Sequence, residues 1–226
     1  MNKKSLIKLL ILLFAVPLTV ILGLIIFNDR GYSFVAICVA GFSLIPILLT
    51  FEKKENNTTR LVILSVMIAL SVAGRFIFAF VPFFKPVTAI VVITGMYMGY
   101  ECGFICGAFT ALISNFMFGQ GPWTPFQMFS WGLIGLGAGI LGKYMIKSRL
   151  LLLIYGIFSG VLFSLIMDVW STMWLDGTFN IIRFYANAIT ALSVTAVYVF
   201  SNVVFLLVLG KPFGKKINRI KTKYGI

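Results

Sequence analysis

The sequence predicts an all-α integral membrane protein, and three observations support this fold class. Of the 226 residues, 60% are hydrophobic and only 11% are charged, and the mean hydropathy is +1.04. Soluble domains have about 45–50% apolar and about 25% charged residues, so the composition excludes a soluble enzyme and a disordered chain. In addition, apolar stretches close to the length of one membrane crossing follow one another along the chain.

Eight apolar stretches are expected to form transmembrane helices. They cover residues 6–27, 31–51, 61–80, 86–100, 102–119, 126–146, 150–170 and 185–209. The first stretch is too long for a secretory signal, and we expect it to be retained as a helix. Two stretches are short and are separated only by Gly99-Tyr100-Glu101, so residues 86–119 form either two full spans or one broken element.

A polar loop over residues 52–60 divides the chain. Residues 1–51 before it are expected to form a transmembrane hairpin with little polar chemistry. Residues 61–210 after it form a six-helix unit that holds nearly every unusual residue. Residues 211–226 form a basic tail, which we expect to lie on the cytoplasmic side.

The excess of cations supports an orientation with both termini in the cytoplasm. The chain has 19 Lys and Arg residues against 6 Asp and Glu, a net charge of +13. With eight spans and a cytoplasmic N-terminus, fifteen cations lie inside, while only Arg30, Lys85 and Arg183 lie outside and Arg75 lies within a span. This is the distribution expected from the positive-inside rule. The charge therefore needs no nucleic-acid partner, and the basic tail would be attracted to anionic lipid.

The chain lacks the residues that most catalytic sites need. Without histidine it contains no HExxH zinc motif and no Ser-His or Cys-His nucleophile pair. Cys38, Cys102 and Cys106 lie in apolar surroundings and are interpreted as small core residues, so we expect no metal and no cofactor. A membrane enzyme that acts on lipid is disfavoured for the same reason. A transporter with this sequence either equilibrates its solute passively or takes energy from partner proteins.

Amide, hydroxyl and tryptophan side chains gather at the span ends that this topology places outside. An interfacial aromatic belt is one explanation, but a belt has tryptophan at both membrane faces and does not require the neighbouring amides. Flat aromatic walls with a few polar groups suit a large, partly polar organic ligand. The candidate ligand-binding residues are Arg75, Asn115, Gln120, Trp123, Thr124, Gln127, Trp131, Asp168, Trp170 and Trp174.

Arg75 and Asp168 lie at similar depths within their spans. A charge at that depth is costly unless it pairs or reaches the interface. The two residues are therefore expected either to form an ion pair between helices or to contact the ligand. Lys85, in the loop that follows, is expected to be exposed.

Small residues recur four apart in several spans. Ala69 and Ala73 form one such pair, Gly103 and Gly107 a second, and a third helix carries Gly132, Gly135, Gly137 and Gly139. Small residues at this spacing let helix backbones approach closely in lipid. They serve either the internal packing of the bundle or the docking of a separate subunit.

Four segments resemble a known family of membrane proteins. They are Ala69-x-x-x-Ala73, Gly74-Arg75-Phe76, Lys85-Pro86-Val-Thr-Ala-Ile-Val and Gly119-Gln-Gly-Pro-Trp-Thr-Pro-Phe-Gln-Met128. The unit from about residue 60 to 210 resembles the substrate-binding (S) component of energy-coupling-factor (ECF) vitamin transporters, and the last segment is most similar to the cobalamin-specific branch. The hairpin over residues 1–51 departs from that family, whose usual unit has six spans.

The resemblance implies a function and a set of partners. An S component captures a vitamin, here cobalamin or another tetrapyrrole, in an outward-facing cavity. It then associates with a transmembrane coupling subunit and two cytoplasmic ATPases, and topples in the membrane to release its cargo. By resemblance Ala69 and Ala73 would face the coupling subunit, and the protein would reside in a bacterial plasma membrane. The alternative is a stand-alone facilitator or channel for a small organic solute.

Overall fold

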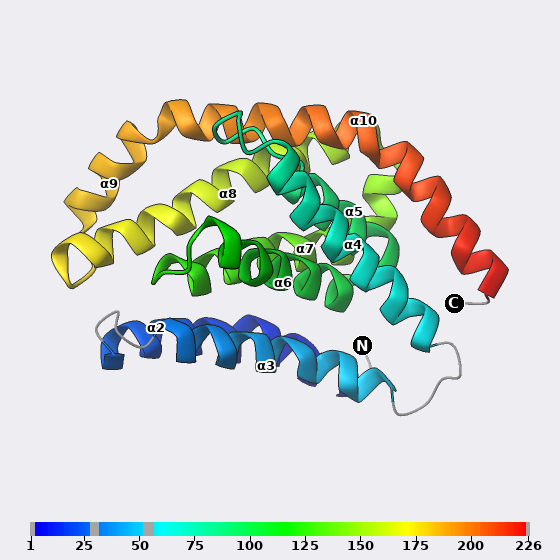
Figure 1. The fold of residues 1–226 in the computed structure, drawn as a ribbon, viewed down its shortest axis with the longest axis horizontal. Helices are drawn as coiled ribbons and strands as arrows, with labels where there is room; N and C mark the ends of the chain where they lie inside the picture. Colours follow the sequence, from blue (N-terminus) through cyan, green and yellow to red (C-terminus); the bar gives the residue numbers. More distant parts are fainter. Residues whose placement is uncertain (1–2, 28–31, 52–56, 225–226) are drawn as a thin grey trace.

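The computed structural model describes residues 3–27, 32–51 and 57–224, and these ranges fold as an all-helical bundle (Figure 1). The first two ranges form the N-terminal hairpin, and the third forms the rest of the bundle. The elements are α1 (Lys3–Leu10), the π-helical turn η1 (Ile11–Ala15), α2 (Val16–Phe27), α3 (Tyr32–Phe51), α4 (Asn57–Ile77), α5 (Val87–Met98), α6 (Tyr100–Phe118), α7 (Trp123–Lys147), α8 (Arg149–Asp176), α9 (Ile181–Thr190) and α10 (Leu192–Tyr224).

Six helices of the described chain are long and apolar enough to cross a membrane, which confirms the predicted fold class. They lie at Leu6–Gly23, Thr58–Ile77, Tyr100–Phe118, Trp123–Lys147, Arg149–Asp176 and Leu192–Tyr224. Two shorter apolar helices accompany them, over Phe34–Ser43 and Val87–Met98.

The region 86–119 forms two helices that pack on each other, and only α6 has the length of a full span. The helix α5 has 12 residues and rises only about 18 Å, well short of the roughly 30 Å of hydrocarbon. It ends at Gly99, whose φ of +94° is open to glycine but strained for other residues. The helix α6 begins at the next residue. Nearly every side chain of α5 is buried, so this short helix lies at the centre of the bundle.

The span predicted over 185–209 begins later than expected, because the helix is interrupted at Ala191. The short helix α9 ends at Thr190, and α10 begins at Leu192 and continues to Tyr224. Hydroxyl groups bind carbonyls on both sides of the break, from Thr190 to Asn187 O at 2.9 Å and from Thr195 to Ala191 O at 2.9 Å. Such side-chain bonds compete with the helical pattern. Residues 211–224 of the expected basic tail lie on the last turns of α10, and the remaining two lie outside the described residues.

Glycines bring the backbones of α6 and α7 into direct contact. A Cβ atom on Gly135 would lie 2.1 Å from the carbonyl oxygen of Gly103, and one on Gly107 would lie 2.3 Å from the backbone of Trp131. These glycines therefore serve the internal packing of the bundle. By contrast, Ala69 and Ala73 are exposed on α4.

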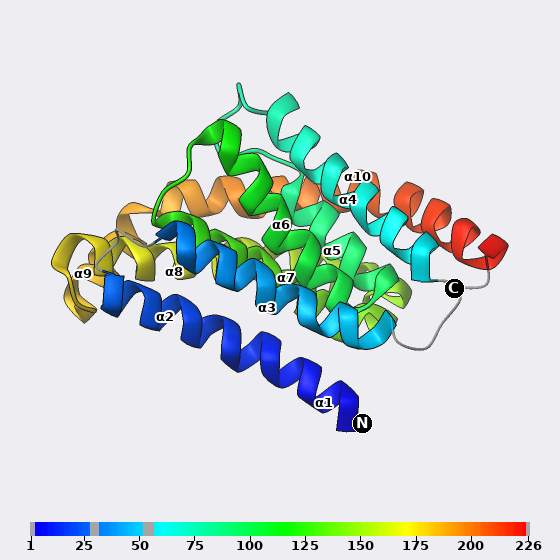
Figure 2. The same ribbon diagram turned by 60° about the horizontal axis from the view of Figure 1, so that its bottom comes forward.

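The N-terminal hairpin packs against the side of α6 and α7, while α4 and α10 cover the other side (Figures 1 and 2). The buried Lys8 ammonium lies 2.9 Å from the Glu101 carboxylate, which also lies 3.5 Å from the guanidinium of Arg60. The carboxylate of Glu101 thus joins the hairpin to the bundle. We call this end of the bundle the glutamate end, and the end that carries residues 78–86 and 119–122 the loop end.

Both described chain ends lie toward the glutamate end (Figure 1). The cations of α1, of the start of α4, of the α7–α8 junction and of the end of α10 therefore belong to the same end of the bundle.

Candidate functional site

Arg75 is buried in the last turn of α4 and is held by the end of α6. Its guanidinium donates to the Ser114 hydroxyl and, at 2.7 Å, to the Asn115 side-chain oxygen. The charge also lies over two rings, 4.7 Å from the centroid of Phe118 and 5.3 Å from that of Trp131. Neutral acceptors and aromatic faces thus stabilise this buried cation.

The expected ion pair between Arg75 and Asp168 is absent from the described residues. The helix α4 packs on α5 and α6, whereas Asp168 belongs to α8. Asp168 is 8% exposed, and no hydrogen bond to its carboxylate occurs among the described residues. The structure thus satisfies Arg75 locally through α6 and places Asp168 outside its reach.

Asn115 is the centre of a buried polar network at the loop end. Its amide donates to the Thr124 hydroxyl at 2.9 Å and to the Gln127 side-chain oxygen at 2.8 Å. The Thr124 hydroxyl donates to Gln120 at 3.0 Å, and the Gln120 amide donates to Leu112 O at 2.9 Å. Asn115 and Thr124 are fully buried, so their polar atoms hold the loop between α6 and α7 in place.

Local sequence explains this loop geometry. The helix α6 ends at Gly119, which has a φ of +98°. Pro122 and Pro125 then flank the start of α7, in the first turn, where a helix tolerates proline. The same residues that suggested a ligand motif therefore build a tight connection between two spans.

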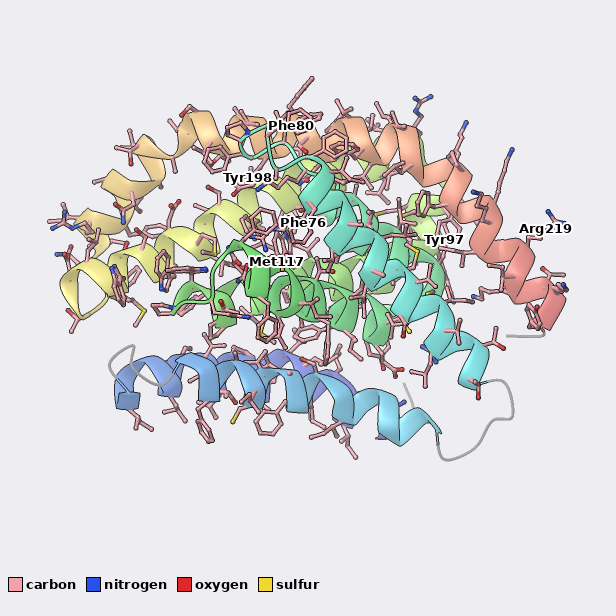
Figure 3. The ribbon with its side chains drawn as sticks, viewed as in Figure 1. Phe76, Phe80, Tyr97, Met117, Tyr198 and Arg219 are labelled. Atoms are coloured by element: carbon pink, nitrogen blue, oxygen red, sulfur yellow. The ribbon has the colours of Figure 1, made fainter. Side chains whose placement is uncertain are left out.

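A small cavity of about 40 Å³ lies next to this network. Three of the predicted residues line it, Arg75, Gln127 and Trp131. The other lining residues are Phe83, Lys85, Val87, Thr88, Phe163, Tyr198 and Asn202. Figure 3 shows Tyr198 of α10 and Phe76 of α4 in this part of the molecule, well away from Tyr97 and Arg219 along the long axis.

Aromatic rings form one wall of the cavity. Trp131 and Phe163 are stacked with centroids 5.1 Å apart, and Phe163 packs edge-on against Tyr198 at 5.1 Å. Phe83 packs edge-on against Tyr198 at 5.7 Å and has a φ of +60°. A non-glycine residue in that region stores backbone strain, which often occurs at functional sites.

Lys85 is half-buried at the cavity, so the expectation that it is exposed is wrong. Its ammonium lies 5.2 Å from the centroid of the Phe118 ring. Its backbone is tied to α10, because Lys85 N donates to the Ser201 hydroxyl at 2.9 Å and that hydroxyl donates to Lys85 O at 3.0 Å. Burial, and secondly the nearby Arg75 charge, lower the pKa of the Lys85 ammonium.

Three predicted tryptophans form a separate row on α7 and α8. Trp123 packs edge-on against Trp170 at 5.9 Å, and Trp170 stacks on Trp174 at 6.2 Å. These residues and Asp168 do not line the cavity. Nine of the ten predicted residues therefore line the cavity, support its loop or form this row, and Asp168 belongs to none of these groups.

Sequence reasoning missed Phe163, Tyr198 and Asn202. Phe163 and Tyr198 lie in the middle of apolar spans, where nothing in the sequence separates them from residues that face lipid. Asn202 carried a usable signal, because an amide is unusual in such a span. Lys85 carried a usable signal. It follows the expected span over 61–80, which contains Arg75, by five residues, and with Pro86 it begins one of the segments that resemble the family.

Among the described residues no group of histidine, cysteine, aspartate and glutamate side chains could hold a metal ion. Cys102 and Cys106 are buried free thiols on α6.

Comparison with known protein families gives one match. The family model described as ECF-type riboflavin transporter, S component, matches residues 55–219. The matched segment begins two residues before α4 and leaves out the N-terminal hairpin. Neither the curated proteins nor the solved structures give a match.

Proposed function

Because the chain belongs to the ECF-type riboflavin transporter S-component family, we propose that it captures a vitamin as the substrate-specific membrane subunit of an importer. A subunit of this family works with a coupling subunit and ATPases rather than alone. The observation that carries the proposal is the cavity at the loop end, where Arg75, Gln127 and Trp131 meet side chains from α8 and α10.

The ligand we propose is riboflavin or a close flavin relative. The matched family is described by that vitamin, and the stacked Trp131–Phe163 wall suits a flat conjugated ring. Arg75, Lys85 and Gln127 supply donors for the carbonyl oxygens of such a ring. Cobalamin, which the sequence segments favour, is the competing ligand, and its corrin would need a wider opening of the same cavity.

Binding requires the cavity to open. Sites for vitamin-sized ligands have volumes of about 300–1,000 Å³, whereas this cavity has about 40 Å³. The loop over residues 78–86 is the element we propose to move, because it carries the strained Phe83, whose ring closes the cavity against Tyr198 of α10. A ligand that displaced Phe83 from Tyr198 would enlarge the aromatic cavity without breaking the Asn115 network.

The exposed face of α4 is the proposed docking surface for the coupling subunit. Ala69 and Ala73 lie on it with their small side chains outward, so a partner helix can approach the backbone closely. An Ala69→Trp substitution is expected to abolish co-purification of the coupling subunit and to leave vitamin binding unchanged. The hairpin does not cover this face, because it packs against α6 and α7.

We also propose that the glutamate end faces the cytoplasm of a bacterial cell and that the loop end faces outward. The positive-inside rule supports this orientation, since the cations at the start of α1, the α7–α8 junction and the end of α10 share one end. The vitamin would then enter from outside, at the end where the cavity lies.

Two measurements on the purified full chain test the proposal. The absorbance spectrum of any co-purified ligand separates a flavin from a corrinoid. Liposomes that contain only this chain are expected to show vitamin binding without flux. Steady flux in such liposomes would instead support the facilitator alternative.

A further inference from the structure

A second concave site lies far from the vitamin cavity, between the first half of α4 and the last half of α10. The groove has a volume of about 640 Å³. Its lining includes Val62, Val66 and Leu70 of α4 and Phe213, Lys216 and Tyr224 of α10. The two helices run in opposite directions, and the start of α4 and the end of α10 both lie toward the glutamate end (Figure 1).

The polarity of the groove changes along its length. The hydroxyls of Thr58, Thr59 and Tyr224 lie at the glutamate end, whereas Leu70 and Phe213 close the other end with apolar surface. The α4 wall from Thr58 to Leu70 extends about 18 Å, which is close to half of the roughly 30 Å hydrocarbon thickness. The groove thus has the length and the polarity gradient of one membrane leaflet.

The charge of the groove has one sign. Neither α4 nor α10 contains an Asp or Glu residue. Lys216 is exposed at the groove wall, and no ion pair of Lys216 occurs among the described residues. Of the neighbouring cations, Lys221 donates to Tyr97 O at 3.0 Å and Arg219 points away from the bundle (Figure 3), while the Lys223 ammonium lies 5.3 Å from the centroid of the Tyr224 ring.

We infer that this groove is a binding site for an anionic phospholipid. The phosphate would lie at the Lys216 ammonium, because a lysine near the membrane surface reaches toward the headgroups. One acyl chain would then lie against the apolar side chains of the α4 wall, such as Val62 and Val66. This inference concerns a different surface from the vitamin cavity and does not depend on the identity of the vitamin.

An anionic lipid matches the charge of the groove, because its phosphate would meet walls on helices that contain no Asp or Glu residue. The exposed stripe that carries Ala69 continues from Val62 and Val66, so a subunit docked there would cover the lipid.

The test uses the purified full chain in nanodiscs with phosphatidylglycerol or phosphatidylcholine that carries a photoreactive group in the acyl chain. We expect phosphatidylglycerol to label peptides of α4 and α10 that contain groove residues, and phosphatidylcholine to label them less. Lys216→Gln is expected to reduce the phosphatidylglycerol labelling about fivefold. Lys215→Gln is the matched control, because it removes the same charge from the adjacent exposed residue, which does not line the groove.

A second variant tests the groove by shape rather than by charge. Val66→Trp fills the middle of the groove, and since Val66 is 50% exposed the substitution does not disturb the core. It is expected to remove the labelling while the thermal unfolding midpoint stays unchanged. Equal labelling by the two lipids, or an equal effect of Lys215→Gln and Lys216→Gln, would overturn the inference. Labelling by phosphatidylglycerol that survives Val66→Trp would also overturn it.

Discussion

Asn115→Ala removes the residue that joins α4, α6 and α7 at the loop end. The Asn115 side chain is fully buried and makes three hydrogen bonds to other elements, one from the Arg75 guanidinium and two to Thr124 and Gln127. Measured hydrogen bonds between membrane helices average about 0.6 kcal/mol and reach about 1.7 kcal/mol. With the charged bond to Arg75 at the upper value, the expected loss in free energy of unfolding is about 3 kcal/mol.

The same substitution is expected to weaken vitamin binding. Arg75 and Gln127 line the cavity, and both lose the partner that fixes their orientation. We expect a dissociation constant about tenfold higher, because a loss of about 1.4 kcal/mol gives that factor. Asn115→Asp distinguishes the bond from Arg75 from the bond to Gln127, since a carboxylate still accepts from Arg75 but can no longer donate to Gln127.

Unfolding in mixed micelles, followed by circular dichroism, measures the stability change, and titration with riboflavin measures the affinity. Asn187→Ala is the matched control, because Asn187 is half-buried on α9 and its amide donates to Thr172 at 3.1 Å. That variant is expected to lose less than about 1 kcal/mol and to bind normally. An Asn115→Ala protein as stable as the Asn187→Ala control, with unchanged affinity, would refute the assigned role of the network.

Three further changes test other parts of the structure. Glu101→Gln leaves the buried Lys8 ammonium of α1 without its counter-charge and is expected to destabilise the fold by about 3 kcal/mol. Asp176→Asn is the control, because its partner Arg183 is exposed, and it should cost less than about 1 kcal/mol. Equal midpoints of thermal unfolding for the two variants would contradict this expectation. Gly135→Ala places a methyl group 2.1 Å from a backbone oxygen of α6 and is expected to prevent normal accumulation of folded protein, while Gly41→Ala, with open space around it, should not. Because burial lowers the pKa of Lys85, its ammonium loses its proton at a lower pH than an ordinary lysine does. Its contribution to vitamin binding is therefore complete near neutrality and declines as the pH rises. Riboflavin titrations at alkaline pH should show a flatter decline for Lys85→Arg.

Much of the fold follows from hydropathy alone, because each apolar stretch must form a helix to satisfy its backbone in lipid. Hydropathy cannot separate a full span from a short buried helix. The helix α5 is apolar all round because the bundle surrounds it, and it has only 12 residues. The break at Ala191 was missed for a related reason, since Thr190 and Thr195 change the hydrogen bonding without interrupting the apolar run.

The sequence prediction and the cavity share three residues, Arg75, Gln127 and Trp131. The segment from Asn115 to Gln127 carries a signal because amides beside aromatics are unusual in a membrane span. The sequence does not say whether those amides face a ligand or one another, and here Asn115 and Thr124 chiefly bind neighbouring side chains. Tyr198 gave no signal, because its place in the cavity depends on how α10 packs against α8.

Titration of the purified chain with riboflavin, with Trp131→Ala compared against Trp174→Ala, tests the central claim most directly. Trp131 is buried at the cavity, whereas Trp174 is 47% exposed in the separate tryptophan row. Loss of a buried tryptophan at the centre of a binding site costs at least about 2 kcal/mol, or roughly a thirtyfold rise in the dissociation constant. The account predicts that rise for Trp131→Ala and a change of less than about twofold, well under 1.4 kcal/mol, for Trp174→Ala. Equal affinities of the two variants would contradict the placement of the vitamin in this cavity.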